Sequence, residues 1–185
     1  DLADFHDLHK NQLSIITFNY DRSLEEYLYR TLCATHSTRK AEVPALLKRI
    51  RILHVHGDLG PLDWQSTAPR GRPYHPHPTD HDILNASLHL PTIHEAQAEN
   101  FAEARPLLGA RPRIVFLGFA YDKTNMINLG GHAICSDTNM VHCSALGKSA
   151  EEIRDIQRKY LPKAHFDPAG CASLQFLRNI PALDD

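Results

Sequence analysis

The sequence predicts an α/β fold built on a mainly parallel sheet with helices on both faces. Four short apolar stretches, each too short for a helix, alternate with segments of helical periodicity. These predicted strands lie near residues 14–18, 52–55, 114–117 and 140–144. Strands that alternate with helices along a chain are typical of parallel sheets, because a helix then forms the connection between successive strands.

We expect one domain that spans residues 1–185, because a chain of 185 residues with 42% hydrophobic composition can bury one core. The 20 basic and 22 acidic residues give a formal charge of −2, which offers no electrostatic footprint for a polyphosphate backbone. We therefore expect no direct nucleic acid partner. No apolar stretch approaches the ~18 residues of a membrane span and no leader pattern opens the chain, so we expect no membrane contact.

The cysteines show no C-x-x-C spacing, which indicates reduced thiols in a cytoplasmic protein rather than a structural zinc site. They are Cys33, Cys135, Cys143 and Cys171. The His-Pro-His-Pro tract at residues 75–78 offers two imidazoles, but its prolines hold the chain extended and splay alternate side chains. We therefore expect no metal.

Helical signals follow the first predicted strand directly. The pattern Ser23-x-x-Glu26 is typical of a capping box, and apolar residues at helical spacing continue to Ala34. A second apolar stripe in residues 43–50 predicts a shorter helix before the second strand.

Residues 60–91 form an insertion of different composition. Six prolines and four histidines fall within this segment. Prolines at that density exclude a regular ladder, because each one lacks the backbone N–H that a ladder requires. We expect a mostly irregular Pro/His-rich excursion, such as a lid.

Further helices are predicted in the second half of the chain. Capping-box patterns at residues 92–95 and 149–152 each precede an apolar stripe, and a short helix is expected at residues 126–129. We expect a last helix near residues 172–179, which would bury Leu174 and Leu177.

Polar residues or glycines follow three of the predicted strands. Asn19 and Asp21 follow the first strand, His56 the second and Gly118 the third. In open parallel sheets the carboxyl ends of the strands form the ligand site, so we expect these residues at one rim. Two of them also have a simpler interpretation, since Asp21 could cap the next helix and a lone histidine at a strand end is often structural.

The residue types at this rim suit catalysis on a small ligand. A carboxamide both donates and accepts, a carboxylate accepts from hydroxyls, and an imidazole takes up a proton near neutral pH. Gly57 after His56 and Gly118 both permit close approach of a ligand to the backbone.

Three stretches resemble motifs of the sirtuin-like NAD-consuming domains, especially those of bacterial anti-phage defence effectors. Thr17-Phe-Asn-Tyr-Asp21 is similar to the family's Thr-x-Asn-hydrophobic-Asp motif, His56-Gly57 to its catalytic His-Gly pair, and Gly118-Phe-Ala-Tyr-Asp122 to its Gly-Thr/Phe-Ser loop. The match covers roughly residues 13–147. No single motif is specific, but their order along an α/β pattern supports the set.

The resemblance implies a Rossmann-like fold and a catalytic set of Asn19, His56 and Asp21. By this resemblance, Asn19 would hold the nicotinamide ribose, Asp21 would help to place the carboxamide, and His56 would be the base. The resemblance further implies that NAD contacts Thr17, Phe18, Asn19, Asp21, Gly118, Phe119 and Gly147.

By this resemblance the expected function is an NAD glycohydrolase that cleaves NAD to nicotinamide and ADP-ribose, with water as the acceptor. The alternative is a non-catalytic module that binds or senses NAD or ADP-ribose. The family also implies a sensor domain or partner protein, and a homo-oligomer is compatible with it.

The sequence departs from the family's pattern at three places. The family's glycine-rich loop is missing before the first strand, which favours the binding module for this chain, whereas Asn19 with His56 favours the hydrolase for the whole protein. Ala120 stands where the family often has serine, and the four-cysteine zinc module of the deacetylases is missing, which argues against a protein deacetylase. The chain begins at Asp1 without a methionine, so we expect a fragment of a longer protein.

Overall fold

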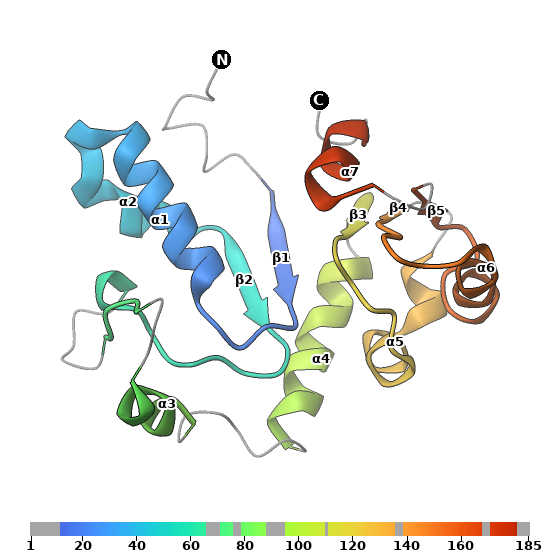
Figure 1. Cartoon of the computed structure of the whole chain (residues 1–185), viewed down its shortest axis with the longest axis horizontal. Helices are drawn as coiled ribbons and strands as arrows, with labels where there is room; N and C mark the ends of the chain where they lie inside the picture. The colour runs from blue at the N-terminus through green and yellow to red at the C-terminus, as the bar shows by residue number, and fades with distance from the viewer. Residues whose placement is uncertain are drawn as a thin grey trace. The chain divides into compact units, whose positions relative to one another are not determined.

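The computed structural model describes residues 12–65, 71–75, 79–87, 95–109, 111–135, 139–167 and 171–180. These residues form two small parallel sheets with helices around them, which confirms the predicted α/β class (Figure 1). The chain divides into two compact units, Asp1–Asn100 and Phe101–Asp185. The single domain expected for the whole chain stays a prediction.

The first unit is built on two parallel strands, β1 (Ser14–Thr17) and β2 (Arg51–His54). Both strands were predicted from the sequence. They are connected by α1 (Ser23–Thr35), the 3-10 helix η2 (Ser37–Glu42) and α2 (Val43–Leu47). This is the strand, helix, strand connection that a parallel pair requires.

Apolar side chains of α1 and α2 form the core of the first unit. Val43, Leu46 and Leu47 of α2 are buried, and Leu28 and Leu32 of α1 pack against them. Leu28 and Leu32 therefore face the predicted stripe of α2, whereas Tyr27, which the same helical spacing assigned to the packed face of α1, is 68% exposed. This packing holds the beginning of α1 next to the end of β2, where the candidate site lies.

The start of α1 differs from the predicted capping box. Arg22 occupies the N-cap position and makes no side-chain cap. Ser23 is the first helical residue, and its hydroxyl shares a hydrogen bond of 2.9 Å with the hydroxyl of Tyr74. Asp21 takes over the capping role, because its Oδ1 accepts the Ser23 N–H at 2.9 Å.

The insertion contains more regular structure than its prolines indicate. A 3-10 turn, η3 (Asp63–Gln65), is followed by α3 (Asp80–Ser87), which was not predicted. This helix has its own capping box, in which the Asp82 N–H donates to Thr79 Oγ1 and Asp82 Oδ2 accepts the Thr79 N–H. No proline falls between residues 79 and 90, so nothing in that stretch opposes a helix.

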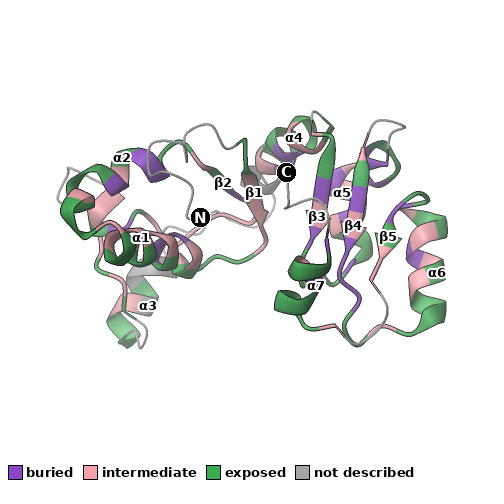
Figure 2. Cartoon of the chain, turned by 90° about the horizontal axis from the view of Figure 1, so that it is seen from above, coloured by how far each residue is buried: buried purple, intermediate pink, exposed green. Residues whose placement is uncertain are grey.

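The second unit is built on β3 (Arg113–Phe116), β4 (Met140–Cys143) and β5 (His165–Phe166), all parallel and in the order β3-β4-β5. Figure 2 shows the three strands side by side, with buried residues on β3 and β4. β3 and β4 were predicted. β5 was not, because two residues carry no detectable periodicity.

Helices flank the strands of the second unit. They are α5 (Lys123–Leu129), the 3-10 helix η4 (Gly131–Ile134), α6 (Ala150–Lys159) and α7 (Ser173–Asn179). The capping box predicted at residues 149–152 is confirmed before α6. α4 (Glu95–Gly109) runs across the boundary between the two units, and Thr92 of its predicted cap lies outside the described residues.

The buried face of α7 differs from the prediction. Leu174 is 62% exposed and Leu177 is half-buried, whereas Phe176 and Ile180 are buried. Phe176 and Ile180 are four residues apart and therefore lie on one face of the chain's last turns. The larger aromatic side chain takes the core position.

Candidate functional site

The candidate site lies where β1 and β2 of the first unit end. Beyond the strands, the Val55 N–H donates to the Thr17 carbonyl at 3.0 Å and the Leu59 N–H to the Tyr20 carbonyl at 3.1 Å. The two segments after the strands therefore run side by side. Asn19 and His56 lie on these segments, at the carboxyl end of the sheet, as the sequence predicts.

Asn19 is exposed at the end of β1. Its backbone N–H donates to Thr17 Oγ1 at 3.2 Å, so Thr17 acts on the backbone of the turn. Asp21 is also exposed. Burial of part of its carboxylate acts to raise the pKa of Asp21, but the hydrogen bonds from Ser23 outweigh this and hold that pKa below its ordinary value.

His56 is half-buried and contacts two aromatic rings. Its ring centroid lies 5.4 Å from that of Phe18, edge to face, and 6.1 Å from that of Tyr20. These two aromatic residues flank Asn19 in the chain. Burial lowers the pKa of His56 below 6.5, so the imidazole is neutral at pH 7.

The other predicted NAD contacts lie in the second unit. Gly118 has a φ of +59°, which favours glycine, and its N–H donates to Ser144 Oγ at 2.8 Å. Phe119 packs with Tyr121 at 5.2 Å between ring centroids. Gly147, with a φ of +76°, lies in the turn before α6. That these residues meet Asn19 and His56 at one rim stays a prediction.

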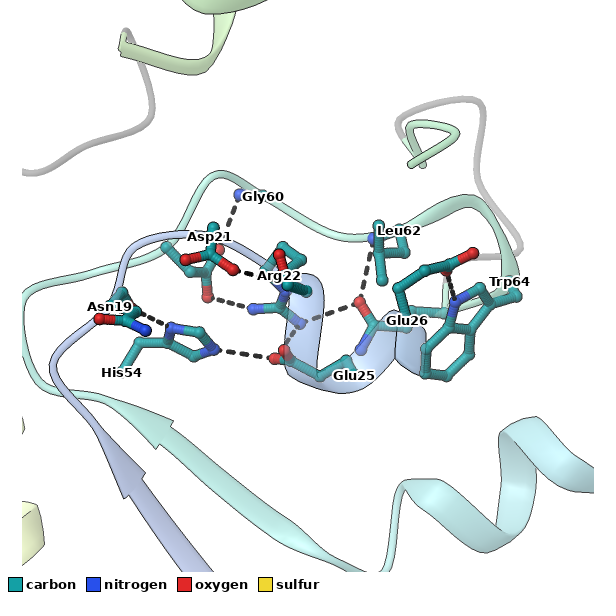
Figure 3. Close-up of polar contacts among 12 residues, drawn as sticks. Asn19, Asp21, Arg22, Glu25, Glu26, His54, Gly60, Leu62 and Trp64 are labelled. Atoms are coloured by element: carbon teal, nitrogen blue, oxygen red, sulfur yellow. Dashed lines mark hydrogen bonds and ion pairs between the residues drawn. The ribbon is translucent and has the colours of Figure 1, made fainter. Parts of the chain in front are cut away.

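His54, the last residue of β2, belongs to the site and was not predicted. Its Nδ1 lies 2.7 Å from the carbonyl oxygen of Asn19, and its Nε2 lies 2.8 Å from Oε1 of Glu25 (Figure 3). The side chains of His54 and Glu25 are each 4% exposed. A buried histidine thus links the backbone of Asn19 to a buried carboxylate of α1.

Arg22 extends this cluster toward the loop after β2. Its Nη2 donates to Oε1 of Gln65 at 2.9 Å and lies 3.2 Å from Oε1 of Glu25. Its Nη1 pairs with Oδ2 of Asp58 at 2.7 Å. Figure 3 shows the side chains converging from the start of α1, the end of β2 and the loop behind it. When the histidine is protonated, negative and positive charges alternate along this cluster, in the order Asp58, Arg22, Glu25 and His54.

The pKa values of the buried pair shift in opposite directions. Burial acts to lower the pKa of His54, but the hydrogen bonds to Glu25 and to the Asn19 carbonyl outweigh it, and that pKa lies above 6.5. Burial acts to raise the pKa of Glu25, but the hydrogen bond from His54 and the charge of Arg22 hold it below 4.5. Each shift therefore favours the ionised form of its group.

One sequence signal could have revealed this cluster. Glu25 precedes Leu28 by three residues and Leu32 by seven, so its carboxylate lies on the apolar face of α1. A carboxylate on a buried face needs a partner, because an unpaired buried charge is costly. The partner, His54, is 29 residues away, and only the fold shows which residue it is.

The described residues hold no candidate metal cluster and no disulfide, and comparison of the chain with known proteins shows no significant relative. No group of three or more His, Cys, Asp or Glu side chains is placed to hold a metal within the described ranges. All four cysteines are described, and none forms a disulfide. Among the helices that the structure describes, none has the length and apolar character to cross a membrane. No protein-family model matches the chain, and no curated protein or solved structure is significantly similar to it.

Proposed function

We propose that the protein cleaves NAD to nicotinamide and ADP-ribose at the carboxyl ends of β1 and β2. The observation that carries the proposal is the half-buried imidazole of His56, which contacts the rings of Phe18 and Tyr20 on either side of the exposed Asn19 in the chain. A general base at neutral pH must be unprotonated, and burial among Phe18 and Tyr20 favours that form. The motif resemblance of these residues supports the same reaction.

The charge that develops in this reaction suits the residues at the end of β1. Nicotinamide leaves as a neutral ring from a cationic one, and positive charge grows on the ribose as the glycosidic bond lengthens. The lowered pKa of Asp21 keeps its carboxylate ionised at neutral pH, where it can stabilise that charge. The carboxamide of Asn19 can orient the ribose hydroxyls by donating and accepting hydrogen bonds.

His56 acts on the water that replaces nicotinamide. The water oxygen forms a bond to the anomeric carbon of the ribose while the bond from that carbon to the pyridine nitrogen breaks. The pair of electrons of the broken bond stays on nicotinamide, and the water's proton passes to the imidazole of His56. The products are nicotinamide, ADP-ribose and one proton, which His56 releases to solvent.

A second candidate function is binding of NAD or ADP-ribose without cleavage. Its support is the use of Asp21 at the helix start, where Oδ1 already accepts the Ser23 N–H. That role explains the conformation of Asp21 without any reaction. In this alternative the same rim serves as a sensor for a larger protein of the defence type.

Nicotinamide release from NAD tests the proposal, with the intact protein that contains this chain. His56→Ala should lower the turnover number on the order of a hundredfold or more, since a positioned base contributes about that much. Asn19→Ala should also lower turnover, because it removes the group that orients the ribose. NAD binding, measured by calorimetry, should survive His56→Ala, because a base acts mainly in the transition state.

His132→Ala is the matched control, because His132 is exposed and lies in the second unit. It should leave both turnover and NAD binding unchanged. NAD binding with no nicotinamide release by the wild-type protein would favour the binding module. A wild-type protein that neither binds NAD nor releases nicotinamide would refute both functions.

A further inference from the structure

We infer that His54 is a positioning residue, which as an imidazolium holds the backbone carbonyl of Asn19 and so fixes Asn19 at the end of β1. The kinetic consequence of this inference rests on the proposed NAD cleavage, whereas the protonation and the positioning do not. His54 does not touch the substrate in this scheme. It acts through Asn19.

Hydrogen-bond accounting supports the protonated form. Nδ1 of His54 faces the Asn19 carbonyl at 2.7 Å, and a carbonyl oxygen only accepts. Nε2 faces the Glu25 carboxylate at 2.8 Å, and an ionised carboxylate also only accepts. Both ring nitrogens must therefore carry a proton for both contacts to be hydrogen bonds. A neutral imidazole would leave one nitrogen lone pair against an acceptor oxygen.

The groups around His54 decide whether this charge is tolerated. Glu25 supplies the opposite charge, at 4% side-chain exposure for both partners. Arg22 at the start of α1 opposes protonation, but its guanidinium is also paired with Asp58, at 2.7 Å. The carboxylate of Asp21 lies near enough for His54 to affect its pKa.

From α4, the neutral amide of Asn100 donates to the His54 carbonyl at 3.2 Å and to the Val55 carbonyl at 3.4 Å. It therefore holds the backbone of β2 where the imidazole is attached.

The contact matters because it is the long-range hydrogen bond of the Asn19 backbone within the described part of the chain. The Asn19 side chain is exposed, and the Asn19 N–H donates locally, to Thr17 Oγ1. The His54 contact ties its carbonyl, and therefore the plane of the Asn19-Tyr20 peptide, to the buried end of β2. The ring of Tyr20 lies 6.1 Å from that of His56 between centroids, so the same peptide joins Asn19 to a residue that packs near the proposed base. When wild-type His54 loses a proton, the remaining proton stays on Nε2 against the ionised Glu25 carboxylate, so the Asn19 carbonyl loses its donor.

Nuclear magnetic resonance of the histidine rings tests the protonation without any substrate. In the intact wild-type protein at pH 7, both ring nitrogens of His54 should show bound protons and the nitrogen shifts of an imidazolium. In Glu25→Gln, His54 should become a neutral ring with the proton on Nδ1, because the introduced side-chain amide can donate to Nε2. A neutral His54 ring in the wild-type protein at pH 7 would overturn the inference.

Turnover tests the positioning role. His54→Gln should lower kcat about tenfold to a hundredfold, as small misplacements of a catalytic group do, with KM changed less than about threefold. Glu25→Gln should keep kcat within about threefold at pH 7, because the neutral ring can still donate to the Asn19 carbonyl. It should also remove the fall in kcat that we expect of the wild-type protein as the pH rises above the pKa of His54. His132→Gln, in the second unit, is the control with unchanged kinetics.

The two proposals fail in different ways. If the wild-type protein releases no nicotinamide, the proposed function fails, and the Asn19 amide resonances still test whether His54 holds the backbone of Asn19. They should shift and broaden in His54→Gln and stay unchanged in His132→Gln. A folded His54→Gln protein with wild-type kcat or wild-type Asn19 resonances would refute the positioning role. If His54→Gln does not fold, Glu25→Gln and the ring protonation of the wild-type protein decide the question.

Discussion

Two consecutive carboxylates of α1 are buried, and each has its own cationic partners. Glu25 is 3% exposed and meets His54 and Arg22, whereas Glu26 is 7% exposed and pairs with Arg30 at 2.5 Å. Neighbouring residues of a helix point about 100° apart, so Glu25 and Glu26 face different parts of the first unit. On the side of Glu26, Trp64 Nε1 donates to Oε2 of Glu26 at 3.0 Å. Arg22 and Arg30 are local partners of these carboxylates, whereas His54 and Trp64, 29 and 38 positions away, are brought to the first turn of α1 by the fold.

The Glu25–His54 pair predicts how stability depends on pH. The folded-state pKa of His54 is raised above 6.5, so its contribution is fully present below pH 6.5 and is lost as the pH rises through the folded pKa. The folded-state pKa of Glu25 is lowered below 4.5, so its contribution is present above pH 4.5 and is lost as the pH falls through the folded pKa. The pair should therefore stabilise the fold most between pH 4.5 and 6.5.

Urea unfolding of the wild-type protein and of His54→Gln, from pH 4 to 9, measures this dependence. The difference in free energy of unfolding should be largest near pH 5 to 6 and should shrink toward pH 9. His132→Gln should track the wild-type protein throughout. A difference that stays constant across this range would show that His54 is not charged in the folded state.

At the scale of elements, one sequence pattern has two structural outcomes. Ser-x-x-Glu occurs at the start of both α1 and α6, but only Ser149 forms the capping box. The Glu152 N–H donates to Ser149 Oγ at 3.3 Å, and the Ser149 N–H donates to Glu152 Oε2 at 2.8 Å. Ser23 does not do the same, because it is already the first helical residue and the Glu26 N–H donates to the Arg22 carbonyl at 3.0 Å.

Ser149→Ala and Ser23→Ala therefore form a matched pair. Ser149→Ala should lower the free energy of unfolding by about 1 kcal/mol, the usual cost of losing a serine cap. Ser23→Ala should cost only a few tenths of a kcal/mol, because it removes one exposed hydrogen bond, to Tyr74. Chemical denaturation followed by circular dichroism measures both changes. Equal losses for the two variants would contradict the assignment of the N-caps.

At the scale of the whole molecule, the chain divides into two compact units, and each has its own parallel sheet. The only tryptophan, Trp64, lies in the first unit, where it stacks on Tyr29 with ring centroids 4.6 Å apart. Its fluorescence therefore reports the unfolding of the first unit alone. Circular dichroism reports the helices of both units.

Core truncations in each unit test whether the units unfold independently. Leu46→Ala should destabilise the first unit by about 3 kcal/mol and shift the Trp64 transition to lower denaturant. Ile114→Ala, in the second unit, should cost a similar amount and leave the Trp64 transition in place. If Ile114→Ala shifts the fluorescence transition as much as Leu46→Ala does, the chain unfolds as the single domain that its length predicts.

The elements that were predicted correctly are those whose evidence is local. β1, β2, β3 and β4 are apolar runs bounded by turn residues, and their pattern is visible within four or five positions. β5 and α3 were missed for opposite reasons. β5 is too short to carry a pattern, and the capping box of α3 lies inside a segment where proline density dominates the composition. The core face of α7 was assigned to its leucines, because spacing alone does not say which of two faces meets the sheet.

The sequence by itself determined the α/β class, the four main strands and the placement of Asn19 and His56 at strand ends, because these follow from local periodicity and turn chemistry. Only the tertiary structure decided that Asp21 rather than Ser23 bonds the start of α1, and that His54 meets both Glu25 and the Asn19 carbonyl. The two contacts of His54 join residues that are 29 and 35 positions apart. A buried polar group takes whichever partner the packing brings within hydrogen-bonding distance, and no local pattern in the chain encodes that choice.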